Sequence, residues 1–476
     1  QKGRPAMIYP TGTTQNLKAF AEAWGIVDET TQMAAANDVE LDQDVWVPGT
    51  LMSFRDVMPM LECLFLVNDL AGGKGHHDGS MKGRDLEQVL GTGMMTMTTE
   101  QRAAWNELTD ADARQVVTVA RPAPGSDNLV IDAADRRAVE LPEAGSKESP
   151  RGGCQKAYEL VAKTFPDNVY VVSCDLNPST KLDKAVAAIA DDHAFEFSIE
   201  EQAAALAANG LAMSGQPGTL NVVSTFAAFF EGIAREGLEL WRYQRNLNGV
   251  NEGLNAVMHL SHVGALTGRD HFSGWSLDWV NLAIGYLPYL HRFYTPADVR
   301  GAFVATLDLA AHYGAHIIGV PRDKVPVLSK ADGSPLFEPD QPWEPLTAMR
   351  TYDGAKKAIL ALGAMAGPAL EAAEELDGEV DAWVVNGLPL NDGQLDELFE
   401  QYPQGVVTIE DGLIGDRYSG TRGFAGVVAA RGARVNLPLA HLGIVDPRIA
   451  PADGMDEVLA HFGLTKDDLV STVKAL

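Results

Sequence analysis

The sequence has few cysteines, few basic residues relative to acidic ones and no long apolar run. Only Cys63, Cys154 and Cys174 occur among 476 residues, which gives neither a disulfide framework nor metal-ligand spacing. Lys and Arg number 37 against 65 Asp and Glu, a formal net charge of −28. This excess argues against nucleic acid or an anionic membrane as a general partner. No apolar run has transmembrane length and no secretory leader starts at Gln1, so we expect a protein of the reducing cytoplasm.

Several common functional motifs are also absent. The sequence contains no Walker A motif, no dinucleotide fingerprint before a helix, no HExxH and no paired CxxC, so none of those sites is predicted. Hydrophobic residues make up 46% of the chain, enough to fill ordinary cores. The length is typical of about three domains.

A regular alternation of apolar strands and amphipathic helices begins at Arg151. Short apolar strands that alternate with such helices predict a parallel sheet covered on both faces. The predicted strands are 168–176, 221–226, 254–263 and 315–320, and the predicted helices are 154–164, 200–212 and 296–313.

A proline-rich run from Val325 marks the boundary to a last α/β domain. There the alternation returns with a helix at 369–376, strands at 382–386 and 405–411, and a final helix at 466–474 with Thr465 at its N-cap. We therefore predict two successive parallel-sheet α/β domains after a mainly helical N-terminal segment. The predicted segments are 1–150, 151–328, a linker at 329–345, and 346–476.

The N-terminal segment is less regular. A short strand at 6–9 has no strand before it to pair with, so we expect the chain to begin within a domain. Helices are predicted at 16–24, 54–70 and 99–108, and the charged, proline-containing stretch 120–150 is predicted to be a surface connection.

The stretch 195–232 joins a helix that opens on paired carboxylates to an apolar strand that ends in phenylalanines. Taken alone, Ser198 and Glu201 predict a capping box, with Ser198 at N-cap and Glu201 at N3. Phe226 and Phe229, taken alone, are core residues by default.

The order of motifs from Arg151 to Leu476 resembles the pyrimidine-binding and C-terminal domains of transketolases. The resemblance implies thiamine diphosphate and Mg²⁺ as cofactors. It places Glu201 against N1′ of the cofactor's aminopyrimidine and Phe226 and Phe229 around that ring. Asp175 in the CDLNPS turn matches an aspartate near the thiazolium.

The same resemblance implies a binding site for a sugar phosphate. Two arginines, a histidine and a serine suit a dianion, because they combine charge-assisted hydrogen bonds with a hydroxyl donor. Each has another interpretation: a lone arginine is typically a solvated surface charge, a lone histidine at a strand end is structural, and Asp175 and Ser179 could cap a helix. The matching phosphate ligands are Arg151, Ser179, His262 and Arg322, with Asp270 at the position that contacts a sugar hydroxyl.

The sequence departs from the transketolase pattern in three ways. No GDG motif with its distant asparagine is found, so the metal and diphosphate ligands are expected on a partner domain or chain, and no metal ligand is predicted in this one. Gly274 stands where the family has a histidine; His271 nearby is the catalytic candidate there. In the N-terminal segment, His77 or its neighbour His76 is a candidate to contact the diphosphate.

These features imply a part or subunit of a transketolase that transfers a two-carbon ketol unit between sugar phosphates. The expected partners are a diphosphate-binding subunit or domain and further copies in a homo- or hetero-oligomer. Two alternatives remain open: the β subunit of a 2-oxo acid dehydrogenase E1 component, and a non-catalytic subunit of a transketolase-like complex. A phosphate pocket has no use for an oxo acid, so Arg151 and Ser179 favour transketolase.

Overall fold

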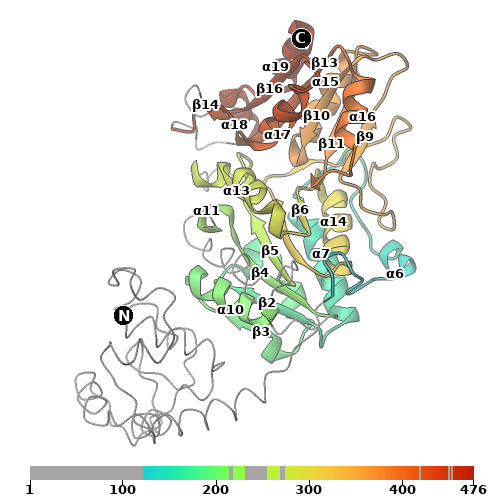
Figure 1. Ribbon diagram of the computed structural model, residues 1–476. Helices are drawn as coiled ribbons and strands as arrows, with labels where there is room; N and C mark the ends of the chain where they lie inside the picture. Colours follow the sequence, from blue (N-terminus) through green and yellow to red (C-terminus); the bar gives the residue numbers. More distant parts are fainter. Residues whose placement is uncertain are drawn as a thin grey trace, which may run out of the picture. The chain divides into compact units, whose positions relative to one another are not determined.

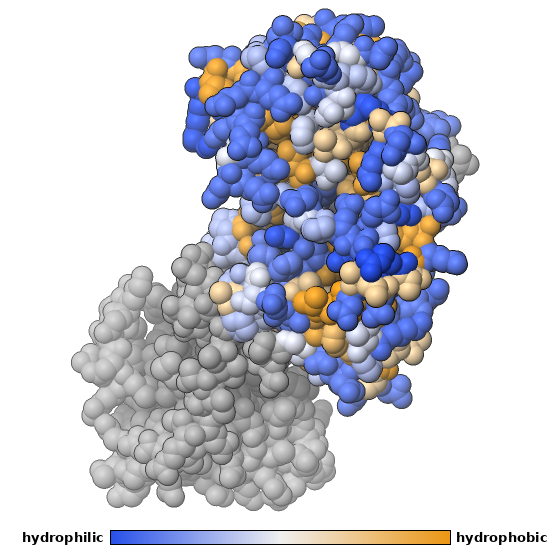
Figure 2. All heavy atoms as spheres, turned by 90° about the vertical axis from the view of Figure 1, so that its right-hand side faces the viewer, coloured by the Kyte–Doolittle hydropathy of each residue, from blue (hydrophilic) through white to orange (hydrophobic). Residues whose placement is uncertain are grey.

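The computed structural model of the protein describes residues 122–213, 218–230, 255–267, 274–416, 420–448, 451 and 454–476 (Figure 1). The elements predicted before residue 122 lie outside this part. No helix among the described residues is long and apolar enough to span a membrane. Figure 2 shows hydrophilic residues over most of the described surface in that view, with apolar residues in small groups.

The first sheet has seven strands, and six of them are parallel. Each parallel strand follows a crossover that contains a helix or a long loop, as parallel pairing requires. The antiparallel exception is the edge strand β12, which pairs with β6. In sheet order the strands are β12 (Gly387–Leu388), β6 (Arg292–Tyr294), β7 (Ala315–Val320), β5 (Ala256–Ser261), β4 (Leu220–Phe226), β2 (Val169–Ser173) and β3 (Ala194–Glu196).

Helices cover both faces of this sheet because its strands are apolar on both sides. Val169 and Val171 pack in one cluster with helices α7 (Arg151–Thr164) and α14 (Val299–Ala311), whereas Val172 packs in another with α10 (Glu201–Met213) and α13 (Trp279–Tyr286). Successive strand residues point to opposite faces, which explains this division. The shorter elements are α6 (Ala133–Arg137), β1 (Lys147–Glu148), α8 (Asn177–Thr180), α9 (Asp183–Val186), η2 (Asp191–His193), α11 (Ala227–Phe229), η4 (Gly274–Leu277), η5 (Leu287–Tyr289) and β8 (Val325–Pro326).

The second sheet has five strands, and its helices also lie on both faces. Its edge strand β9 is antiparallel to β11, and the other pairs are parallel. The strand order is β16 (Leu439–Ile444), β13 (Gly405–Leu413), β10 (Lys357–Leu362), β11 (Val380–Val385) and β9 (Leu346–Arg350). The accompanying helices are η6 (Gly363–Met365), α15 (Ala366–Glu375), α16 (Gln394–Gln401), α17 (Gly423–Gly432), α18 (Met455–Phe462) and α19 (Lys466–Ala475), and the remaining strands are β14 (Gly415–Asp416) and β15 (Gly420–Thr421).

One apolar cluster joins the two sheets. It contains Met258 and Trp279 from the first sheet and its helices, together with Leu360, Phe399 and Phe424 from the second. The two α/β layers therefore share buried surface.

The predicted fold class is confirmed, with one correction and several additions. Both sheets were predicted to be parallel, but each has an antiparallel edge strand. Thr465 does cap α19: its hydroxyl accepts the N–H of Asp468, whose carboxylate accepts the N–H of Thr465. Within the two sheets, strands β3, β6, β9, β10, β12 and β16 were not predicted.

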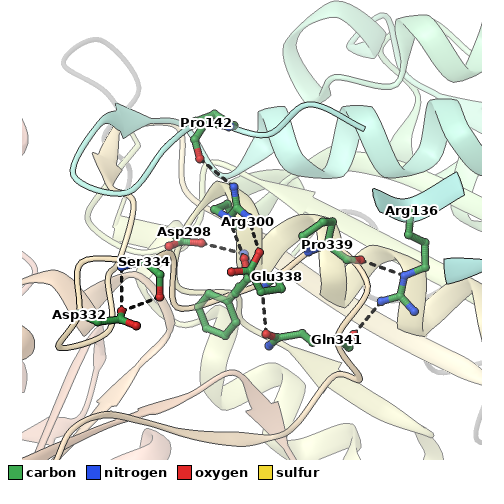
Figure 3. Close-up of polar contacts among 11 residues, drawn as sticks. Arg136, Pro142, Asp298, Arg300, Asp332, Ser334, Glu338, Pro339 and Gln341 are labelled. Carbon is green, nitrogen blue, oxygen red and sulfur yellow. Dashed lines mark hydrogen bonds and ion pairs between the residues drawn. The ribbon is translucent and has the colours of Figure 1, made fainter. Parts of the chain in front are cut away.

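The proline-rich linker is bound to the start of α14 (Figure 3). The Asp298 carboxylate accepts the N–H groups of Gly301 at 2.7 Å and of Leu328 at 2.8 Å. Arg300 donates to the carbonyls of Phe337 at 2.7 Å and Pro142 at 3.1 Å. These bonds tie both the linker and the stretch before α7 to the first sheet's helix layer.

Helices α7 and α14 approach each other closely at Gly153, which gives a test of the packing. A Cβ there would lie 1.9 Å from the carbonyl oxygen of Val299 and 2.9 Å from the nitrogen of Phe303. Neither backbone atom can move aside easily, so we expect Gly153→Ala to destabilise the protein by about 1–3 kcal/mol or more. Gly152→Ala is the matched control, since its Cβ would meet only the Val299 Cγ2 at 3.7 Å. Thermal unfolding should show a lower midpoint for the first variant only; equal midpoints would contradict this packing.

The fully buried Glu410 in β13 makes stability depend on pH. Burial raises its pKa from 4.5 to about 8. The native state therefore favours the protonated acid, and the resulting stabilisation is full below pH 4.5 and is lost as pH rises towards 8. Glu410→Gln keeps an oxygen for the Ala425 N–H, which Oε1 accepts at 2.8 Å, and does not ionise. We expect the unfolding midpoint of this variant to rise relative to wild type between pH 5 and 8. Glu400→Gln makes the same substitution at an exposed position and is the matched control. Parallel curves for Glu410→Gln and wild type would show that Glu410 does not titrate in this range.

Candidate functional site

Most of the described candidate residues follow the carboxyl ends of adjacent parallel strands. Asp175 follows β2, Phe226 ends β4, His262 follows β5 and Arg322 follows β7, and these four strands are neighbours in the first sheet. The carboxyl ends of parallel strands meet at one edge, where ligands of α/β proteins typically bind.

Arg151 forms hydrogen bonds with the other three predicted phosphate ligands. Its NH1 donates to the carbonyl oxygen of Ser179 at 2.6 Å and to Nε2 of His262 at 3.0 Å. Its NH2 donates to the carbonyl oxygen of Arg322 at 3.4 Å, and its Nε to the hydroxyl of Ser149 at 3.2 Å. Ser179 thus contacts Arg151 through its backbone. The structure brings these residues together from four separate stretches of sequence.

The cluster concentrates positive charge in a partly buried place. Burial and the nearby Arg322 guanidinium lower the pKa of Arg151 to about 10, and Asp323 offsets this only in part. A partly buried guanidinium with a second guanidinium nearby forms a favourable place for an anion. The electrostatics of the cluster therefore suit a phosphate.

His262 contacts both the arginine and the aromatic residues. It is 4% exposed, has a positive φ of 58°, and stacks on Phe226 with ring centroids 3.9 Å apart. A guanidinium can only donate, so Nε2 of His262 must accept, and the neutral ring then carries its proton on Nδ1. The His262 ring is thus held at Nε2 by Arg151 and on one face by Phe226.

Phe226 lies between His262 and Phe229. The Phe226 and Phe229 rings are 5.8 Å apart and inclined by 21°, and both side chains are only partly buried. They are therefore not ordinary core residues. The aromatic pair predicted to hold a pyrimidine adjoins the predicted phosphate ligands.

Glu201 is the first residue of α10, and the capping-box alternative is wrong. The first helical bond runs from the N–H of Ala204 to the carbonyl of Glu200, and Ser198 has a positive φ of 53°, so Ser198 is not the N-cap. Glu201 is 4% exposed. Its charge adds to the effect of burial in raising the pKa of Cys174, at the end of β2, to about 11. Glu201 is therefore a buried carboxyl near the same sheet edge.

Asp175 does not cap a helix. It is exposed, has a φ of 58°, and donates its N–H to the Glu196 carboxylate at 2.6 Å. The next helix, α8, has Leu176 at its N-cap and no side-chain cap bond. Ser179 lies within α8, so the capping alternative is wrong for it too.

Three candidates lie outside the described residues: His77, Asp270 and His271. Their roles stay predictions. Sequence reasoning also missed Asp411, whose Oδ2 accepts the N–H of Ala265 at 3.1 Å in the loop after His262. Two acids at the end of the apolar stretch GVVTIED were the signal that could have identified it.

Within the described ranges, no group of three or more His, Cys, Asp or Glu side chains could hold a metal ion. A pocket of about 350 Å³ lies between the two α/β layers and is lined by residues that include Leu266, Pro326, Pro368 and Lys466. None of the predicted site residues lines it, so we place the candidate site at the sheet edge.

Comparisons with known proteins agree with this arrangement. Residues 149–326 match the family described as "Transketolase, pyrimidine binding domain". A solved structure described as "Split gene transketolase, inactive beta4 tetramer" is 25% identical, with a TM-score of 0.53, and the match covers 69% of this chain and 97% of that one. No curated protein sequence matches the chain.

Two further solved structures share the fold. The transketolase from Leishmania mexicana is 15% identical with a TM-score of 0.57, and the match covers 83% of this chain and 58% of that one. The transketolase from Pichia stipitis, in complex with sedoheptulose-7-phosphate, is 16% identical with a TM-score of 0.54. The match covers 79% of this chain and 53% of that one. This chain thus spans little more than half the length of those two enzymes. Residues 149–326 thus match the pyrimidine-binding domain of transketolases, and the chain shares its fold with the transketolases above.

Proposed function

We propose that this chain is a part or subunit of a thiamine diphosphate-dependent transketolase that transfers a two-carbon ketol unit between sugar phosphates. The observation that carries the proposal is the cluster in which Arg151 contacts Ser179, His262 and Arg322, directly beside the aromatic pair. It combines a place for a phosphate with a place for an aromatic ring at one sheet edge.

The described residues fit the pyrimidine half of the cofactor. When bound, thiamine diphosphate supplies the carbanion chemistry of ketol transfer. Phe226 and Phe229 are partly buried, which leaves ring surface for contact with a flat ligand. Glu201, at 4% exposure, provides a carboxyl that can share a proton with N1′. Ligands for the diphosphate and Mg²⁺ are proposed on another domain or a partner chain.

The substrate proposal rests on charge. A phosphate dianion would be held by Arg322 and Arg151 and would favour the charged form of Arg151, whose pKa is lowered by burial and by the charge of Arg322. The Pichia stipitis transketolase, similar in fold, is described in complex with a phosphorylated sugar, which supports the same substrate class here. A 2-oxo acid would leave this cluster without a role.

The proposal of a partner chain rests on exposed apolar residues near Glu201. Ile199 is 77% exposed and Leu206 on α10 is 39% exposed, although both lie within a few residues of the buried Glu201. Apolar side chains beside a functional carboxyl suit contact with another chain. The similar split-gene transketolase is described as inactive as a β4 tetramer, which supports activity only in a larger assembly.

The role of Glu201 can be tested with Glu201→Gln. The amide keeps the size and a hydrogen bond but cannot readily provide the proton that N1′ needs. We expect exchange of the cofactor's C2 proton to slow by about 10²–10⁴-fold in the assembled enzyme, measured by NMR, with cofactor affinity much less affected. Glu200→Gln alters the adjacent exposed acid and should exchange at the wild-type rate. Wild-type exchange in Glu201→Gln would assign Glu201 a structural role.

The phosphate pocket can be tested with Arg322→Ala. We expect KM for a phosphorylated sugar to rise by about ten- to a hundredfold, the effect of one charge-assisted contact, while hydroxypyruvate reacts as before. Lys324→Ala removes a nearby exposed cation, paired with Glu148 at 3.2 Å, and should leave both substrates unaffected. Equal damage to both substrates would make Arg322 structural. If the wild-type enzyme does not distinguish phosphorylated from unphosphorylated substrates, the 2-oxo acid dehydrogenase alternative is favoured.

A further inference from the structure

Asp411 belongs to the second sheet but binds the backbone of the first. It is 6% exposed, near the end of β13, and its Oδ2 accepts the N–H of Ala265 at 3.1 Å. Burial raises the pKa of Asp411 to about 6, although the amides of Ala265 and Leu266 oppose that rise. A carboxylate in such a place needs donors, and the loop after β5 supplies them.

An irregularity in β13 accompanies this contact. The pairing of β13 with β16 shifts register between Ile409 and Leu413. Such irregularities redirect side chains relative to a regular strand. The shift spans Asp411, which leaves the regular ladder and contacts the loop.

The loop backbone fits tightly against this carboxylate. Gly264 has a φ of +64°, and a Cβ there would lie 1.9 Å from Oδ2 of Asp411. Its N–H donates to the carbonyl of Ser276 at 3.0 Å, and the Ser276 hydroxyl donates to its carbonyl at 2.9 Å. Glycine is therefore required for the approach, and the loop has little freedom to shift.

The same loop carries or contacts two of the proposed phosphate ligands. His262 lies two residues before Gly264. Leu266, at the other end, accepts the backbone N–H of Arg322 at 2.8 Å through its carbonyl oxygen. A displacement of the loop would therefore move His262 and Arg322 together, and with them two of the acceptors of Arg151.

The neighbouring acid, Glu410, binds a different segment. Glu410 is fully buried, and its carboxylate accepts the N–H of Ala425 in α17 at 2.8 Å. The two adjacent carboxylates of β13 thus hold different segments: Glu410 holds a helix of its own layer, and Asp411 holds the loop of the other.

We infer that Asp411 is a positioning residue through which the second α/β domain sets the geometry of His262 and Arg322. The inference rests on the proposed function only for the identity of the anion. The contact between Asp411 and the loop after β5 is independent of that function. It gives the second domain a part in substrate recognition through a contact with the backbone of the loop.

The test uses Asp411→Ala in the full chain, with inorganic phosphate as the probe. We expect calorimetry to show about tenfold weaker phosphate binding, the loss typical of one misplaced hydrogen-bonded contact. In ¹⁵N NMR of labelled histidine, assigned with His262→Gln, the His262 ring should lose its Nδ1–H form because Arg151 no longer donates to Nε2. Glu410→Ala is the matched control, and it should lower the unfolding midpoint without changing the phosphate affinity or the His262 signal. Asp411→Asn keeps the side-chain volume and should show a smaller loss in the same direction if the alanine variant does not fold.

The outcomes separate this inference from the proposed function. Wild-type phosphate affinity and an unchanged His262 signal in the folded Asp411 variants would overturn it. Equal losses in the Asp411 and Glu410 variants would also overturn it, since they would reflect general destabilisation. If wild type binds no phosphate while the His262 signal changes only in the Asp411 variants, the positioning role stands and the phosphate proposal fails.

Discussion

The hydrogen bonds of one guanidinium, that of Arg151, define the candidate site. Arg151 begins α7, and α7 is fixed against α14 by the close approach at Gly153. From this fixed position it donates to acceptors that follow β2, β5 and β7. A planar group with five N–H donors can bridge several acceptors at once, which a lysine cannot do in the same geometry. Packing between two helices thus determines where charge is placed at the sheet edge.

The second sheet contributes to this edge through buried acid groups. Glu410 and Asp411 are adjacent, and burial raises the pKa of both. The pKa values rise because burial disfavours the charged form of a carboxyl group. Each is retained where backbone amides point at it. Together with the apolar cluster shared by the two layers, these bonds connect the second sheet and its helices to the loop that follows β5.

The sequence predicted the elements with strong local signals. β7 was predicted at its observed bounds, and the final helix has its predicted cap at Thr465, because apolar runs and caps are encoded by neighbouring residues. The antiparallel edge strand at 387–388 was missed because its partner lies about a hundred residues earlier. The capping box failed because Ser198 adopts a positive φ and donates its N–H to the Glu196 carboxylate, so a different local hydrogen bond replaced the expected one.

The resemblance identified residues that local patterns alone would have assigned to the surface or the core, but it did not give their contacts. Ser179 was expected to offer its hydroxyl to a phosphate, which stays a prediction, and its carbonyl oxygen also accepts a hydrogen bond from Arg151. His262 was expected at the phosphate, and it also stacks on Phe226 at 3.9 Å. One imidazole therefore touches both the arginine of the proposed phosphate pocket and the aromatic ring of the proposed pyrimidine site. Because a rigid ring cannot tilt at one contact without disturbing the other, a change at the proposed phosphate pocket should also change the proposed pyrimidine site.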